Sequence, residues 1–183
     1  VARDPKLVCI VPMVNAERRA QFEGILAKYP VPGLRCIASD SVRPGPSGPS
    51  SPVAWTVMEA SSAVLVASGT ATLEAALFKR PMVISYILSP LMRRIMAWKS
   101  GQNRPYLPWI GLPNVLARDF VVPEILQDDV TPDALTEATW RALTDDAHRE
   151  DVERRFTEIH HALLRDTPAL AAQVIMEVAV GRA

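Results

Sequence analysis

The chain has 183 residues, 49% of them apolar and 22% charged, which is ordinary for one globular domain with a sizeable core. Its 20 basic residues balance its 20 acidic ones, so no overall charge favours a nucleic-acid partner or an acidic substrate. No apolar run reaches the roughly 18 residues that a membrane-spanning helix needs, and the first residues do not predict a secretory signal. Cys9 and Cys36 lie in strand-like apolar runs, which predicts buried, reduced thiols and favours a cytoplasmic protein.

The first elements follow a strand–helix–strand order. Leu7–Val11 is a continuous apolar run of strand length, and Leu34–Ala38 predicts a second strand. Between them, Asn15 is an expected N-cap for a helix over 16–29. The apolar residues expected to share one face of this helix are Phe22, Ile25 and Leu26.

After a Pro-, Gly- and Ser-rich stretch over 39–52, which predicts a surface loop, the alternation resumes. A short helix is expected over Val53–Ser61, a third strand over Ala63–Ala67 and a fourth over Pro81–Tyr86. Strands alternating with helices predict an α/β protein with a Rossmann-like parallel sheet and helices on both faces.

The character changes towards the C-terminus. Three helical stretches follow Thr131, and both Thr131-Pro132 and Thr167-Pro168 are typical of an N-cap followed by proline at the first helical position. We therefore expect an α/β domain over residues 1–130 and C-terminal helices over residues 131–183.

The junction between the third strand and the next helix could carry chemistry. Ligands of open parallel sheets bind beyond the carboxyl ends of the strands, where Ser68, Gly69 and Thr70 are expected. Glycine allows close backbone approach, and the free N–H groups of a helix start suit a diphosphate, with Thr72 as a further hydroxyl donor. Glu74, one turn later, could accept hydrogen bonds from sugar hydroxyls. From these residues alone, a plain strand–helix turn is an equal alternative.

A cationic segment with apolar and aromatic residues follows the fourth strand. Such a mixture suits a helix lying on an anionic membrane surface, and its alternative is an ordinary surface helix with one face in the core. The residues of this expected membrane patch are Met92, Arg93, Arg94, Met96, Trp98 and Lys99.

Other polar residues carry weaker signals. Asn114, Glu124 and Gln127 could face one cleft, although each is more typical of a cap or turn than of a catalytic residue. The three histidines lie on the C-terminal helices without partners at metal-ligand spacing, so no metal site and no nucleophilic triad is predicted.

Three stretches together resemble one family. They are VPMVNAERRAQFEGI from Val11, ASGTATLEAALFKRPMVISY from Ala67 and GLPNVLARDFVVPEILQDDVTPDAL from Gly111. In this combination they are similar to the C-terminal half of lipid-A-disaccharide synthase, a GT-B glycosyltransferase of Gram-negative bacteria that works in the cytoplasm at the inner-membrane surface. The resemblance covers nearly the whole chain, from about Leu7 to the final helix.

The resemblance implies transfer of 2,3-diacylglucosamine from UDP-2,3-diacylglucosamine to 2,3-diacylglucosamine 1-phosphate (lipid X). The products are the disaccharide 1-phosphate of lipid A biosynthesis and UDP, and neither a metal nor another cofactor is implied. By the same resemblance Ser68, Gly69 and Thr70 lie at the diphosphate, Glu74 at the ribose, and Asn114 is a catalytic position near the donor. It also implies contact of the membrane patch with the inner membrane, and a homodimer that exchanges the C-terminal helices.

The chain departs from the family pattern as well. The family enzyme has an N-terminal acceptor-side domain and a Gly-Ser-Arg loop after the first strand of its donor domain, and neither is found in this sequence. By this comparison, residues 1–130 are expected to form a UDP-sugar-binding domain that lacks its first strand. Those pieces are expected to carry the general base and a diphosphate-binding arginine, so this chain alone is expected to be inactive. The alternatives are another GT-B enzyme acting on UDP-N-acetylglucosamine, and a non-catalytic module that binds nucleotide or docks on membranes.

Overall fold

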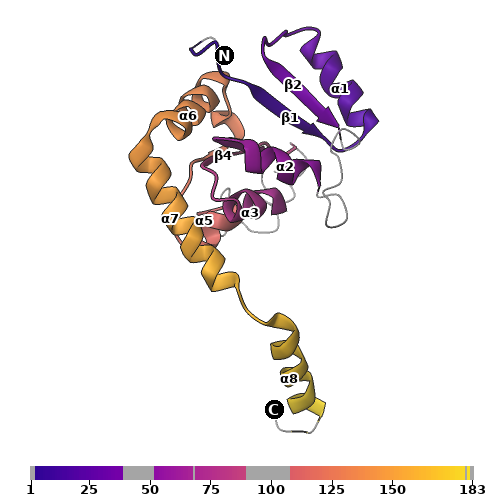
Figure 1. Ribbon diagram of the computed structural model, residues 1–183, viewed down its shortest axis with the longest axis vertical. Coiled ribbons are helices and arrows are strands. Elements are labelled where there is room, and N and C mark those ends of the chain that lie inside the picture. The colour runs from indigo at the N-terminus through magenta and orange to yellow at the C-terminus, as the bar shows by residue number, and fades with distance from the viewer. Residues whose placement is uncertain (1–2, 39–51, 68, 90–107, 180, 182–183) are drawn as a thin grey trace.

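The computed structural model describes residues 3–38, 52–67, 69–89, 108–179 and 181. Strands and helices alternate as far as β5, and helices follow to the end of the chain (Figure 1). The strands are β1 Cys9–Met13, β2 Leu34–Ala38, β3 Val64–Ala67, β4 Met82–Tyr86 and β5 Glu124–Leu126. The helices are α1 Ala16–Leu26, α2 Val53–Ala60, α3 Thr70–Leu77, α5 Leu112–Ala117, α6 Pro132–Thr144, α7 Asp146–Leu163 and α8 Thr167–Ala179, with a 3-10 turn, η2, at Gln127–Asp129.

All strand pairings in the described part of the chain are parallel. β1 pairs with β2, and β3, β4 and β5 form a second sheet in that order. Met82, Val83 and Ile84 of the central strand β4 have no exposed surface, as expected for a strand covered on both faces. The mixed α/β architecture with helices flanking parallel sheets confirms the predicted Rossmann-like class.

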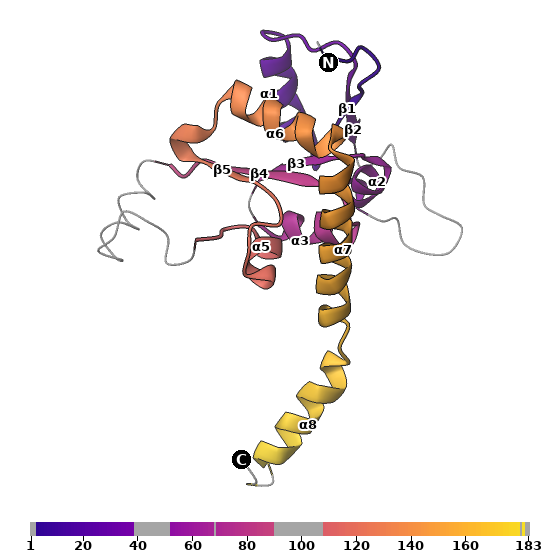
Figure 2. The same cartoon turned by 90° about the vertical axis from the view of Figure 1, so that its left-hand side faces the viewer.

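Helices cover both faces of the three-stranded sheet (Figure 2). α6 lies on one face, α3 and α5 lie on the other, and α7 runs alongside. Val152, Phe156 and Ile159 of α7 are buried in one cluster with Ala75 and Ala76 of α3. Because alanine side chains are small, α3 and α7 can pack closely, and this packing holds α3 against its face of the sheet.

The helix α8 lies apart from the rest of the molecule (Figures 1 and 2). It has no buried residue, and several of its apolar side chains are more than half exposed. These are Val174, Ile175, Met176 and Val178. The apolar side chains of α8 therefore have no packing surface within the described residues.

The predicted caps are only partly correct. Asn15 accepts a hydrogen bond from the Arg18 amide at 2.9 Å, and Thr131 accepts one from the Ala134 amide at 3.2 Å, as expected. At the last helix the prediction was wrong by one residue, because Asp166 accepts from the Ala169 amide at 3.1 Å. A short acidic side chain is an equally good N-cap, which the Thr-Pro pattern concealed.

Other differences concern burial and short elements. Asn114, which the sequence favoured as a cap or turn residue, lies inside helix α5, and neither α5 nor β5 was predicted. Helix α1 has no buried residue, and Ile25 is 59% exposed, because among the described elements α1 packs mainly on the narrow two-stranded sheet. Cys9 and Cys36 are free thiols but only half-buried, not buried as predicted.

Candidate functional site

The carboxyl ends of β3, β4 and β5 meet at one edge of the sheet. The register aligns Ala67 with Ser85 and Tyr86 with Leu126, so the segments leaving these strands start side by side. The amide of Leu88, just beyond β4, donates to the side-chain oxygen of Gln127, just beyond β5, at 3.3 Å. This edge is where an open parallel sheet binds its ligand.

Gly69 makes the turn from β3 into α3 and precedes the first helical residue. Its φ of 135° and ψ of −163° are open to glycine and hardly to any other residue. A Cβ at this position would meet no atom within 4 Å, so backbone geometry rather than crowding demands the glycine. Gly69 and Thr70 are both exposed, and the first amides of α3 are therefore accessible to an anion. Ser68, the other residue predicted here, lies outside the described residues.

Thr72 does not have the role expected from the sequence. Its side chain is completely buried, and its hydroxyl donates to the Gly69 carbonyl at 2.7 Å. The Thr72 amide bonds the same carbonyl at 3.1 Å. Thr72 thus fixes the conformation of the turn from inside and is not a hydroxyl donor to a ligand.

Glu74 lies in the second turn of α3 and is half-buried. Its Oε2 accepts a hydrogen bond from the indole Nε1 of Trp55 on α2 at 3.0 Å. Trp55 in turn packs edge-to-face on Phe78, with ring centroids 6.4 Å apart. Sequence reasoning passed over Trp55, since a single aromatic residue in a short helix has no distinguishing pattern.

Asn114 is buried, with no exposed surface, and is bonded on every side. Its Oδ1 accepts from the amides of Val121 and Val122 at 2.9 and 3.1 Å. Its Nδ2 donates to the Val122 carbonyl and to Oε1 of Glu124, both at 2.9 Å. An amide engaged in this way shapes the chain around it, and its catalytic assignment stays a prediction.

Glu124 anchors the segment that enters α5. Its two carboxylate oxygens accept from the amides of Ile110 and Gly111, both at 2.8 Å, in addition to the Asn114 bond. A Cβ on Gly111 would collide with Cδ1 of Ile84, so the segment lies directly against β4. Asn114 and Glu124 therefore share one network, as grouped from the sequence, while Gln127 lies at the sheet edge.

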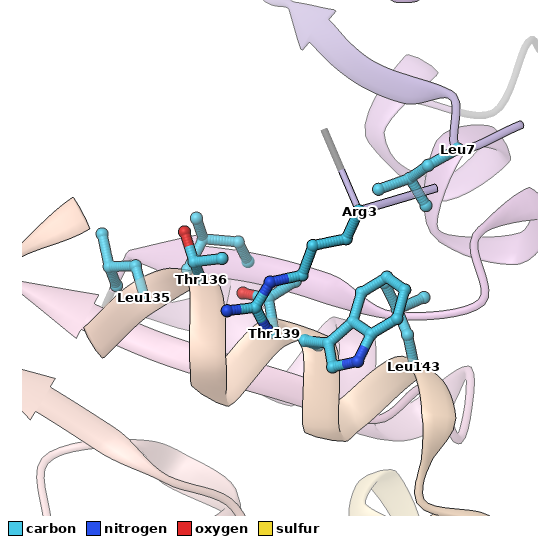
Figure 3. Close-up of a pocket in the computed structure, with 8 residues that line it drawn as sticks. Arg3, Leu7, Leu135, Thr136, Thr139 and Leu143 are labelled. Atoms are coloured by element: carbon cyan, nitrogen blue, oxygen red, sulfur yellow. The ribbon is translucent and has the colours of Figure 1, made fainter. Parts of the chain in front are cut away.

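A groove of about 370 Å³ lies away from this edge, between the N-terminal segment, β3 and α6 (Figure 3). Arg3 reaches across it to an ion pair with Glu137, and its guanidinium lies 5.9 Å from the centre of the Trp140 ring. The lining is mostly apolar and comprises Arg3, Leu7, Leu65, Leu135, Thr136, Thr139, Trp140 and Leu143.

Two further expectations concern membranes and metals. The six residues of the predicted membrane patch lie outside the described residues. Within the described ranges, no helix is long and apolar enough to cross a membrane. In that same part of the chain, no group of three or more His, Cys, Asp or Glu side chains is arranged to hold a metal ion.

Parallel strands, a glycine turn into a helix at their carboxyl edge and a nearby carboxylate define a Rossmann-like domain with a candidate nucleotide site. Residues 3–175 match the family described as lipid-A-disaccharide synthetase, and the chain belongs to this family.

Curated relatives named lipid-A-disaccharide synthase agree with this family assignment. The protein from Bordetella petrii is 71% identical over 181 residues, covering 99% of this chain and 45% of the relative. The one from Cupriavidus pinatubonensis is 41% identical over 175 residues, covering 96% of this chain and 39% of the relative. The chain thus spans less than half the length of these relatives.

Proposed function

We propose that this chain is the donor-nucleotide half of a lipid-A-disaccharide synthase. In the proposed reaction, 2,3-diacylglucosamine is transferred from UDP-2,3-diacylglucosamine to lipid X. A hydroxyl oxygen of lipid X bonds to the anomeric carbon of the donor, the bond to UDP breaks, and the hydroxyl proton passes to a base outside this chain. The observation that carries the proposal is the glycine turn at the carboxyl edge of β3, within a chain of this family.

The diphosphate side of the donor is assigned to the turn before α3. The exposed Gly69–Thr70 turn offers backbone N–H groups at the positive end of a helix, which stabilise the growing charge of the leaving UDP without a metal. Ser68 belongs to the same proposed site, and Glu74 is assigned to the ribose hydroxyls.

The role proposed for Asn114 follows from its burial. Its four hydrogen bonds leave no polar group for a substrate, and they hold the start of α5 and the residues before β5 in one conformation. We therefore propose that Asn114 supports activity as a positioning residue, together with Glu124, and does not touch the donor.

The rest of the site is proposed to come from the remaining length of the parent enzyme. Within the described residues, β1 and β3 each have one unpaired edge, and Val8 and Leu65 beside these edges are 48% and 52% exposed. Apolar side chains at unpaired parallel edges favour a further strand between the two sheets, completing residues 1–130 as one domain. The apolar groove next to Leu65 would be covered by the same addition.

Two associations complete the proposal. The cationic patch from Met92 to Lys99 is proposed to lie on the inner-membrane surface on the cytoplasmic side, where both acylated substrates reside. The exposed apolar side chains of α8 are proposed to pack in a homodimer of the parent enzyme.

A reconstitution experiment tests the proposed function. The chain is assayed for UDP release from UDP-2,3-diacylglucosamine and lipid X, alone and mixed with the part of the Bordetella petrii relative that it does not match. We expect no turnover alone and turnover in the mixture, and the two halves of the relative itself, mixed in the same way, are the control. Activity of the control without activity of the mixture would refute the donor-half assignment.

A second candidate is a nucleotide-binding module without catalysis, favoured by the 45% coverage of the relatives. It predicts UDP binding by the chain and no turnover when the chain is mixed with that part of the relative, while the control mixture is active. The same assay therefore separates the two functions.

A further inference from the structure

Trp55 projects from α2 towards the proposed nucleotide site. It is the third residue of α2, between the buried Val53 and Val57, so a well-packed helix fixes its backbone. Helix α2 precedes β3, and α3 follows it. The C-terminal end of α2 is hydrogen-bonded to the segment before β4, because Arg80 donates to the Glu59 carbonyl at 2.5 Å. The first turns of α2 and α3 therefore lie together near the carboxyl edge.

The hydrogen bond from Trp55 to Glu74 uses only one side of the carboxylate. Nε1 of Trp55 donates to Oε2 at 3.0 Å, and in the described part of the chain no other hydrogen bond to this carboxylate is present. The contact of the Trp55 ring with Phe78 restricts the indole as well. Trp55 thus restrains the Glu74 side chain through Oε2, and Oε1 has no hydrogen-bond partner among the described residues.

The indole is at the same time accessible. Trp55 is 40% exposed although its N–H group already has a protein partner, so part of the apolar ring faces solvent. A ribonucleoside presents an apolar base and two neighbouring hydroxyl groups. A flat apolar ring beside a fixed carboxylate complements both, because the ring can pack on the base and the carboxylate can accept hydrogen bonds from the hydroxyls.

We propose that Trp55 is a positioning residue for a ribonucleoside diphosphate, holding Oε2 of Glu74 so that Oε1 accepts from the ribose hydroxyls, with its exposed ring facing the nucleoside. This inference rests on the proposed function and adds to it a residue on a different helix. Fixing the carboxylate before binding reduces the conformational entropy lost when the ribose binds, so the benefit is specific to ligands that carry these hydroxyls.

Calorimetric titration with two probes tests this role. UDP and 2′,3′-dideoxy-UDP are titrated into the wild-type chain, into Trp55→Phe, which keeps an aromatic ring but loses the N–H donor, and into Trp140→Phe as a matched control on α6. We expect Trp55→Phe to weaken UDP binding roughly 3- to 10-fold and to leave dideoxy-UDP binding nearly unchanged. Trp140→Phe should change neither.

A second variant guards against a folding defect in Trp55→Phe. Glu74→Gln keeps the residue size, and we expect it to remove most of the preference for UDP over dideoxy-UDP. An unchanged UDP affinity in Trp55→Phe, or an equal loss for both probes, would overturn the role of Trp55 while leaving the proposed function intact. No UDP binding by the wild-type chain would overturn both.

Discussion

Buried and exposed polar side chains contribute differently to the stability of this protein, as two asparagines illustrate. Asn15 caps α1 at the surface through one hydrogen bond, while Asn114 is fully buried and makes four. Removing a buried amide leaves its partners without hydrogen bonds in a place that water does not reach. Sequence alone does not distinguish the two, because a helix cap or a turn is a typical role for either asparagine.

This contrast predicts unequal losses of stability. Asn114→Ala should lower the free energy of unfolding by about 2–4 kcal/mol, since the amides of Val121 and Val122 lose their acceptor. Asn15→Ala should cost about 1 kcal/mol, as an exposed cap. Urea denaturation monitored by circular dichroism measures both. Similar small losses for the two variants would contradict the structural role of Asn114.

A second prediction at the residue scale concerns Asp145, which caps α7. The hydrogen bond from the His148 amide, followed by the one from Arg141, holds the pKa of this carboxyl below its usual range. Because the pKa is lower in the folded state, the stabilisation is present above the unfolded pKa and is lost as pH falls through the folded one. Asp145→Asn should lower the melting temperature by about 1–4 °C near neutral pH, with the difference from wild type shrinking below about pH 4.

Melting curves at a series of pH values measure this difference. Asp146→Asn, which removes the same charge one residue further along the helix, controls for the change in net charge. A gap between wild type and Asp145→Asn that stays constant down to the lowest pH would refute the assignment.

At the scale of elements, the alternation of apolar runs and amphipathic stretches was enough to predict four strands. Each was correct within about two residues, the usual uncertainty of element boundaries. The misses have physical causes. Helix α5 is six residues long with Pro113 near its start, and β5 has three residues, so neither is long enough to display a period.

The separation into two sheets could not be predicted either. Both β1 and β3 have the composition of a buried strand, and their local sequence does not indicate which neighbouring strand each one pairs with. In the candidate site, the sequence pointed to Gly69, Thr70 and Glu74, since a turn at a strand end has a readable pattern. It missed Trp55 and gave Thr72 the wrong role, because both depend on contacts formed only in the folded chain.

The exposed helix α8 gives a prediction at the element scale. Leu170, Val174 and Val178 follow each other at four-residue spacing and are 49%, 58% and 61% exposed. If this stripe packs against a second copy, the chain should sediment as a dimer, and the double variant Val174→Lys/Val178→Lys should sediment as a monomer.

Sedimentation velocity over a series of protein concentrations checks this association. The matched control is Gln173→Lys, which adds a charge to the same helix at a residue whose side chain donates a hydrogen bond to Glu177. This variant should remain dimeric. A wild-type chain that stays monomeric throughout the series would contradict the homodimer.

At the scale of the whole molecule, the features fit a chain that provides part of a larger site. The glycine turn and the carboxylate anchored by Trp55 form one side of the proposed nucleotide site. The unpaired edges in the described sheets, the apolar groove and the isolated α8 are three surfaces that the described residues leave uncovered. Membership of the lipid-A-disaccharide synthetase family, at less than half the length of the relatives, gives these surfaces a common explanation.

The central claim is that the Gly69 turn holds the diphosphate of UDP, and the change in melting temperature on adding UDP tests it most directly. UDP should raise the melting temperature of the wild-type chain and should not raise that of Gly69→Val. The matched control is Gly33→Val, since Gly33 also has a positive φ, 78°, but precedes β2 away from the site. Its melting temperature should still rise with UDP, whereas equal shifts in all three proteins, or none in the wild type, would contradict the claim.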